Sequence, residues 1–161
     1  MHNMSLRIGD KAPDFSLYAS TKELTHLYDF RGRNVVLLFF PLAFTSTCTQ
    51  ELCATRDAMD EYNALDTSVL AISVDSPQTL AKYKEVYELN FTLLSDFNKE
   101  VIRAYDVMYE EYSLGMRGVS KRAVFVLDAE GTIRHMEVLE VAGNMPDLDA
   151  VKDSIRHLQT A

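Results

Sequence analysis

The sequence predicts an α/β fold in which helices flank a central mixed β-sheet. Short apolar runs, rich in β-branched or aromatic residues, recur along the chain of 161 residues, and stretches with helical apolar spacing separate them. A turn signal between the last two strand-like runs predicts a hairpin, which adds antiparallel strands to a parallel core. The hydrophobic content of 47% and the charged content of 25% are those of an ordinary globular protein, so we expect one domain spanning residues 1–161.

Four segments are expected to form strands. Val35–Phe40 (VVLLFF) and Val69–Val74 (VLAISV) are short and almost entirely apolar, which is typical of strands buried on both faces. Ala123–Leu127 (AVFVL) leads into the turn signal DAEG. The next segment, TIRHMEV at 132–138, is therefore predicted to be the return strand of a hairpin.

Helical patterns lie between and after these strands. From Cys48 onward, Leu52, Met59 and Tyr62 recur on one helix face. In the next pattern, SPQTLAKYKEVYEL, Pro77 stands at a helix start, where its missing N–H costs little.

Two more helices are expected later in the chain. Asn98–Tyr105 is predicted to be a short helix with Asn98 as its N-cap. The C-terminal helix begins near Met145, and its inward positions are Leu148, Val151, Ile155 and Leu158. This order of strands and helices fits a thioredoxin-like α/β sandwich, among other α/β folds.

Composition excludes several classes of function. The net charge is −8 and the basic residues are scattered, which disfavours a nucleic-acid surface. No apolar run approaches the roughly 20 residues that span a membrane, and the start of the chain lacks the apolar stretch of a signal peptide. We therefore expect a cytoplasmic protein. The four histidines show no ligand-like spacing with the two cysteines, and no nucleotide or flavin motif occurs, so neither a metal nor a cofactor is expected.

The stretch FFPLAFTSTCTQELC holds both cysteines, just after the first predicted strand. Binding sites in such sheets lie beyond the carboxyl ends of strands. Thr47, Ser46 or Thr45 is the candidate N-cap of the following helix, so Cys48 falls in the first helical turn. Unpaired N–H groups and the helix dipole there stabilise a thiolate. Two nearby thiols favour redox or nucleophilic chemistry, and the alternative is a pair of small buried hydrophobic residues.

Cys53 lies about 140° around the helix from Cys48 and about 7.5 Å further along its axis. The implied separation of the two Cα atoms is about 8.6 Å, which exceeds the limit of about 7 Å for a disulfide. The two thiols therefore cannot join while the helix is intact, and its first turns must unwind. The alternative is that Cys53 is packed under the helix and never pairs.

These segments resemble the peroxiredoxin family. Pro41, Thr45 and Cys48 match its P-x-x-x-T-x-x-C signature, and Arg122, before a late strand, matches its essential arginine. The resemblance extends over nearly the whole chain, through IGDKAPDF, FFPLAFTSTC, ISVDS and GVSKRAVFVLDAEGTIR. FFPLAFT and GVSKRAVFVLD look most like the alkyl hydroperoxide reductase E type. CTQELC is similar to the Q-type, or bacterioferritin comigratory, enzymes, whose resolving cysteine lies five residues after the reactive one.

The resemblance implies a thiol-dependent peroxidase that reduces hydrogen peroxide and organic hydroperoxides. Cys48 would be the nucleophile that becomes a sulfenic acid. Thr45 would offer its hydroxyl to Cys48 and the peroxide, Arg122 would place a cation near the sulfur, and Pro41 would shield the thiolate from water. Cys53 would resolve the sulfenic acid as an intramolecular disulfide with Cys48.

Each role has a plainer structural explanation. The alternative roles are a helix cap for Thr45, a surface charge at a strand start for Arg122, and strand termination for Pro41. Glu51 matches an acidic position that holds an arginine in many peroxiredoxins. An exposed acidic residue that favours the helix dipole explains Glu51 equally well.

Other functions remain as alternatives. In the main hypothesis thioredoxin reduces the disulfide, whereas a one-cysteine cycle would regenerate Cys48 through mycoredoxin or glutaredoxin. A thioredoxin-like disulfide oxidoreductase usually needs C-x-x-C, which is absent. A non-catalytic binding module of the same fold is disfavoured by the near-complete motif. A homodimer is common among similar enzymes, and no sequence feature demands it.

Overall fold

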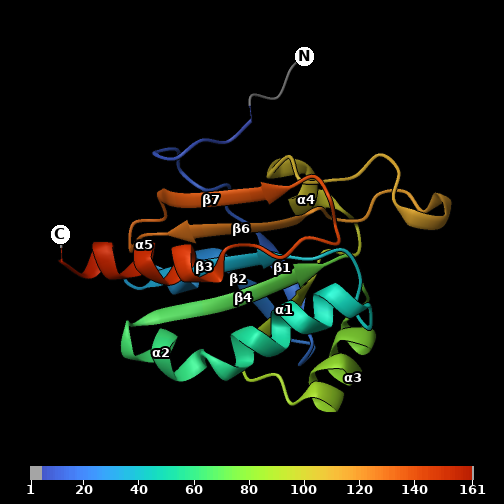
Figure 1. Ribbon diagram of the computed structural model, residues 1–161, viewed down its shortest axis with the longest axis horizontal. Helices are drawn as coiled ribbons and strands as arrows, with labels where there is room; N and C mark the ends of the chain where they lie inside the picture. Colours follow the sequence, from blue (N-terminus) through green and yellow to red (C-terminus); the bar gives the residue numbers. More distant parts are fainter. Residues whose placement is uncertain (1–4, 161) are drawn as a thin grey trace.

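The computed structural model describes residues 5–160 of the chain. Its centre is a seven-stranded sheet with the strand order β2-β1-β5-β4-β3-β6-β7 (Figure 1). The strands are β1 (Ser16–Ala19), β2 (Leu24–His26), β3 (Asn34–Phe39), β4 (Thr67–Ser73), β5 (Thr92–Ser95), β6 (Arg122–Leu127) and β7 (Ile133–Leu139). β4 runs parallel to both β3 and β5, and the other pairings are antiparallel. The predicted α/β fold with a mixed central sheet is confirmed.

Helices cover both faces of the sheet, and each face has its own apolar core (Figure 1). One core lies beneath α1 (Ser46–Asp57), α2 (Met59–Ala64), α3 (Pro77–Tyr87) and α5 (Leu148–Thr160). The other lies beneath α4 (Glu100–Ala104) and the 3-10 helix η1 (Leu27–Phe30). A second 3-10 turn, η2 (Ser113–Gly115), lies in the long connection between α4 and β6.

The middle strands are buried on both faces, as the apolar runs predict. In β3 and the residue after it, Val36, Leu38 and Phe40 belong to the core under α1, while Val35, Leu37 and Phe39 belong to the opposite core. All six residues of β3 and all six of β6 are buried. This burial fixes the pairing register, because a slip of one residue exchanges the two faces.

Three helix boundaries differ from the sequence prediction. The C-terminal helix α5 begins at Leu148, three residues later than expected. The helix expected to run from Cys48 to Tyr62 is broken, because Ala58 has φ −100° and ψ 3°, which ends α1 before α2 begins. The cap predicted at Asn98 is wrong. Lys99 is the N-cap of α4, and the buried Asp96 carboxylate accepts hydrogen bonds from the first backbone N–H groups of that helix.

Other expected features are confirmed. The four predicted strands match β3, β4, β6 and β7 to within two residues at each end. Pro77 is the first helical residue of α3, as expected. Ser76, which the sequence analysis did not identify as a cap, accepts a hydrogen bond from the Thr79 N–H. Strands β1, β2 and β5 were not predicted.

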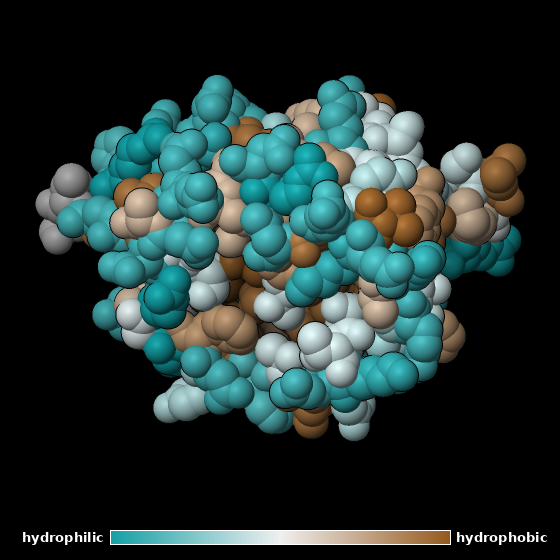
Figure 2. Space-filling view, turned by 90° about the horizontal axis from the view of Figure 1, so that it is seen from below, coloured by the Kyte–Doolittle hydropathy of each residue, from teal (hydrophilic) through white to brown (hydrophobic). Residues whose placement is uncertain are grey.

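The surface seen from below is mostly hydrophilic, with apolar side chains gathered in a central hollow and at a few separate points (Figure 2). Scattered polar side chains of this kind agree with the net charge of −8. Among residues 5–160, no helix has both the length and the apolar character that crossing a membrane requires.

Candidate active site

The loop between β3 and α1 is fixed from two sides. The backbone N–H of Ala43 donates to Asp75 Oδ2 at 2.8 Å, and Asp75 follows the end of the neighbouring strand β4. Within the loop, the hydroxyl of Thr45 donates to the carbonyl oxygen of Leu42 at 2.7 Å. Thr45 is the N-cap residue of α1, but its side chain caps no N–H of the helix. The loop therefore presents the start of α1 at the carboxyl end of β3 (Figure 1).

Cys48 is the third residue of α1 and has no exposed surface. Its position in the first turn, predicted from the sequence, is confirmed. Phe40 and Leu52 belong to the same core cluster, so apolar side chains surround the thiol on the side of the sheet. On its polar side, Cys48 Sγ lies 3.2 Å from Nη1 of Arg122, which donates a hydrogen bond to it.

Sheet register brings Arg122 to this sulfur. In the antiparallel pair of β3 and β6, Phe39 faces Ala123, so Arg122 lies at the end of β3 where the loop to α1 begins. The interpretation of Arg122 as a surface charge is wrong, because only 1% of its side chain is exposed. Its Nε and Nη2 both donate to the carbonyl oxygen of Ala142, at 3.2 and 2.8 Å. The guanidinium is thus held from behind by the chain that links β7 to α5.

The guanidinium charge is stable despite this burial. Burial disfavours the charged form of Arg122, but the nearby Cys48 and Glu51 outweigh it and raise the arginine pKa above its ordinary value. The site therefore keeps a permanent cation in direct contact with the Cys48 sulfur.

Glu51 completes the buried cluster. Its side chain is fully buried, and Oε1 lies 3.0 Å from Nη1 of Arg122, the same nitrogen that contacts Cys48. The exposed role considered for Glu51 is therefore wrong, and its contact is the one that the peroxiredoxin resemblance implies. Burial raises the pKa of Glu51 to about 7, although Arg122 lowers it in part, and Glu137 raises it slightly. The second oxygen, Oε2, is buried without a hydrogen-bond partner among the described residues.

Cys53 lies on a different face of α1, and both thiols are free. It is half-buried and shares a helix face with Thr49 and Arg56, four residues before it and three after. Both neighbours contact α3. The hydroxyls of Thr49 and Tyr83 are 2.9 Å apart, and Nη1 of Arg56 donates to the carbonyl oxygen of Tyr87 at 2.7 Å. Since α1 is unbroken from Ser46 to Asp57, the two cysteines are held apart in this state.

The sequence-predicted site residues Pro41, Thr45, Cys48 and Arg122 thus meet at one end of the sheet, and Cys53 lies one helix face away. The expected contact between the Thr45 hydroxyl and Cys48 is absent from the described hydrogen bonds. Sequence reasoning did not identify Asp75 as the anchor of the loop, although it lies in the quoted ISVDS segment. It also missed the Ala142 carbonyl, because a backbone acceptor has no side-chain signature.

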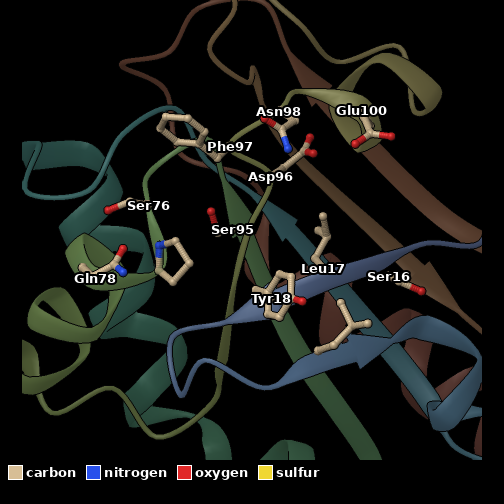
Figure 3. A pocket seen from close by; sticks show the side chains of 12 residues that line it. Ser16, Leu17, Tyr18, Ser76, Gln78, Ser95, Asp96, Phe97, Asn98 and Glu100 are labelled. Carbon is tan, nitrogen blue, oxygen red and sulfur yellow. The ribbon is translucent and has the colours of Figure 1, made fainter.

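A cavity of about 440 Å³ lies elsewhere, between the β1–β2 hairpin and the starts of α3 and α4 (Figure 3). Tyr18 and Phe97 line it from different elements, together with polar side chains such as Gln78 and Asn98. Neither Cys48 nor Arg122 lines this cavity. Among the described residues, no group of three or more acidic, histidine or cysteine side chains is arranged to hold a metal ion.

Comparisons with known proteins identify the family of this chain. The AhpC/TSA family model matches residues 8–136. Peroxiredoxin Bcp of Escherichia coli K12 is 41% identical over 133 residues, which cover 81% of this chain and 85% of that protein. A putative peroxiredoxin Bcp of Haemophilus influenzae is 39% identical over 130 residues, covering 80% and 83%.

Solved structures show the same fold. Peroxidoxin BcpB from Mycobacterium tuberculosis matches with a TM-score of 0.84 and 29% identity, covering 94% of this chain and 97% of that one. A peroxiredoxin-like protein from Aquifex aeolicus matches with a TM-score of 0.88, covering 97% and 90%, but at 23% identity this likeness concerns the fold alone. These neighbours confirm the thioredoxin-like fold that the order of elements predicted.

Proposed function

The chain belongs to the AhpC/TSA family as a Bcp-type peroxiredoxin, a thiol-dependent peroxidase, and on this premise we propose that Cys48 is the sulfur that attacks the peroxide. The observation that carries the proposal is the 3.2 Å contact between Cys48 Sγ and Nη1 of Arg122, in the first turn of a helix. A fixed cation and a helix N-terminus both stabilise negative charge that develops beside them.

The proposed reaction is a displacement at oxygen. The Cys48 thiolate attacks one peroxide oxygen, the S–O bond forms, and the O–O bond breaks. The sulfur is oxidised to a sulfenic acid, while the departing hydroxide or alkoxide takes up a proton and leaves as water or alcohol. Arg122 stabilises the negative charge as it moves from the sulfur to the departing oxygen.

Thr45 and Pro41 are proposed to position the peroxide. The Thr45 hydroxyl donates its hydrogen bond to the Leu42 carbonyl. Its oxygen can therefore still accept a hydrogen bond from the peroxide. Pro41 begins the loop and shields the thiolate. Because Cys48 has no exposed surface, the peroxide is expected to enter when the hydrogen bond between Ala43 and Asp75 opens and releases the loop at 41–45. Phe44, at the positive φ of 65° and 48% exposed, is the member of this loop with strained backbone.

We propose that Cys53 then resolves the sulfenic acid as a Cys48–Cys53 disulfide, which a thiol reductant such as thioredoxin reduces. The half-exposed position of Cys53 on the same helix supports this step. The second candidate is a one-cysteine cycle in which mycoredoxin or glutaredoxin regenerates Cys48. It is favoured by the unbroken helix that separates the two thiols.

One experiment tests the nucleophile and the cycle together. The reduced protein is treated with one equivalent of hydrogen peroxide, quenched with acid and weighed by mass spectrometry. Loss of two hydrogens indicates the disulfide, and gain of one oxygen indicates a persistent sulfenic acid. Cys48→Ser is expected to abolish peroxide consumption, and Cys53→Ser to accumulate the oxygen adduct. Undiminished peroxide consumption by Cys48→Ser would reject the proposal.

Three further proposals concern the extent of the domain, the cellular compartment and the oligomeric state. We propose that residues 1–161 form one domain and that the protein acts in the cytoplasm, where thiols such as Cys48 and Cys53 are kept reduced. A homodimer is proposed from the resemblance alone, and size-exclusion chromatography with light scattering tests it.

A further inference from the structure

The helix segment that joins the two cysteines contains a buried carboxylate. Cys48 and Cys53 both lie within the unbroken helix α1, so the disulfide requires the segment between them to unwind. Glu51 lies inside this segment, three residues after Cys48. Any unwinding that brings the two sulfurs together therefore moves Glu51 as well.

The surroundings of Glu51 oppose this movement when its carboxyl group is protonated and favour it when the group is ionised. Its carboxylate faces Arg122 from β6, Glu137 from β7, Tyr62 from α2 and Cys48 from its own helix. One oxygen is paired with Arg122, which also contacts Cys48, and the other is buried with no hydrogen-bond partner within residues 5–160. The Cys48 sulfur and the Glu51 carboxyl group thus share a single buried cation.

We propose that Glu51 couples the unwinding of the 48–53 segment to the loss of a proton, and is thereby a positioning residue for the resolution step. The proposal rests on the proposed function, since it concerns the approach of Cys53 to the oxidised Cys48. It assigns to Glu51 a role beyond holding Arg122.

The direction of the coupling follows from the surroundings of the carboxylate. In the wound helix, burial raises the pKa of Glu51 to about 7 from its ordinary 4.5. In the unwound segment the side chain reaches water and regains the ordinary value. Between pH 4.5 and about 7, the wound helix binds more protons than the unwound segment. The stability of the wound helix relative to the unwound segment is therefore greatest below pH 4.5 and falls as the pH rises to about 7. Tyr62, whose pKa burial raises to about 12, and Arg122 do not change charge in this range.

The chemical step that follows unwinding is balanced without another reagent. The Cys53 thiolate attacks the sulfur of the Cys48 sulfenic acid, the S–S bond forms and the S–O bond breaks. Hydroxide leaves and takes up a proton to become water. The coupling changes how often the two sulfurs meet, and it leaves this chemistry as it is.

The first test compares the wild type with Glu51→Gln, which stays neutral at every pH. After one peroxide equivalent, acid-quenched samples are weighed over time to obtain the rate of disulfide formation between about pH 5 and about pH 8. The ratio of the wild-type rate to the variant rate is expected to rise by about 10-fold or more across this range. Taking the ratio cancels every effect of pH that both proteins share. A ratio independent of pH would overturn the proposal.

Thr49→Val is the matched control, because it removes the Thr49–Tyr83 contact of the same segment without removing a titratable carboxylate. Thr49→Val is expected to change the rate of disulfide formation by the same factor at every pH. If Thr49→Val reproduces the pH dependence of Glu51→Gln, a general loosening of the helix explains both variants, and the proposal fails.

A second measurement needs neither resolution nor a Glu51 variant. In Cys48→Ser, no thiol titrates beside Glu51, and hydrogen exchange of the amides at 46–53 reports the unwinding directly. Protection, corrected for intrinsic exchange, is expected to fall by about 10-fold or more between about pH 5 and about pH 8. Constant protection would overturn the coupling. If peroxide fails to oxidise Cys48 in the wild type, the proposed function fails, and the exchange result still decides the coupling.

Discussion

Arg122 is the residue that organises the site. A single nitrogen, Nη1, serves both Cys48 and Glu51, while Nε and Nη2 serve the Ala142 carbonyl. Only a planar fork of several fixed N–H groups can make these contacts at once. A lysine would keep the charge but would lose the hydrogen bonds to the Ala142 carbonyl. Its ammonium group could not contact Cys48 and Glu51 with the same geometry.

Arg122→Lys is therefore expected to lower kcat/KM for hydrogen peroxide by about 10²- to 10³-fold, the usual cost of losing one aimed donor. The rate is measured by peroxide consumption with a thiol reductant in excess. Lys121→Arg is the matched control, because Lys121 pairs with the exposed Glu140 at the surface, and it is expected to keep its activity. Full activity of Arg122→Lys would show that charge alone suffices.

At this scale the sequence predicted the position of Cys48 in its helix better than the contacts around it. Cys48 in the first helical turn was predictable from the strand, the proline and the capping residues. Arg122 could be chosen over Lys121 only through the family resemblance, because the register that turns it inward depends on the pairing of β6 with β3. The burial of Glu51 was not predictable, since an acidic residue near a helix start is usually exposed.

At the scale of elements, the start of helix α3 was predictable from the local sequence alone. Pro77 begins the helix, as the sequence predicted, and the structure adds that Ser76 accepts the Thr79 N–H at 3.1 Å. This helix also supplies Tyr83 and Tyr87, which contact the face of α1 that carries Cys53. The cap of α3 therefore contributes to the support of the helix that holds both thiols.

Ser76→Ala is expected to lower the free energy of unfolding by about 1 kcal/mol, because it leaves an N-terminal N–H of α3 without its acceptor. Urea denaturation followed by circular dichroism measures the change. The matched control is Ser113→Ala, at an exposed serine whose hydroxyl makes no hydrogen bond within residues 5–160, and it should leave stability nearly unchanged. Equal losses in the two variants would contradict the capping role.

The elements that sequence reasoning missed are those that tertiary pairing creates. β1, β2 and β5 have only three or four residues each, which is too short for a clear periodic pattern. β5 is a strand because it pairs with β4 on one side and β1 on the other. The break at Ala58 was missed because the apolar positions of α1 and α2 continue in helical spacing across it.

At the scale of the whole molecule, the alternation of strands and helices was enough to predict the fold class. It did not predict the strand order, in which β1 lies beside β5, because that order depends on long-range pairing. The consequence for function is that the site combines residues from distant parts of the chain. β3 leads into the loop, α1 carries the sulfurs, β6 brings the cation, and the chain after β7 holds it.

Oxidation is expected to change this assembly in one place only. Formation of the Cys48–Cys53 disulfide should remove about two turns of helix at the start of α1 and leave the sheet intact. Far-UV circular dichroism after one peroxide equivalent should show a loss of helix signal that dithiothreitol reverses. Cys53→Ser, which cannot close the bond, should show none. A disulfide formed without loss of helix would mean that the cysteines meet by another movement.

The anchor of Arg122 on Ala142 is a main-chain oxygen, and every amino acid carries one. Substitutions in the connection after β7 can therefore alter its side chains without deleting the acceptor, provided that the path of the backbone is kept. An insertion, a deletion or a proteolytic cut there would move the Ala142 carbonyl and release the Arg122 guanidinium, although Cys48, Glu51 and Arg122 themselves would be unchanged. The peroxidase should thus tolerate changes of residue identity at this place and be vulnerable to changes of length.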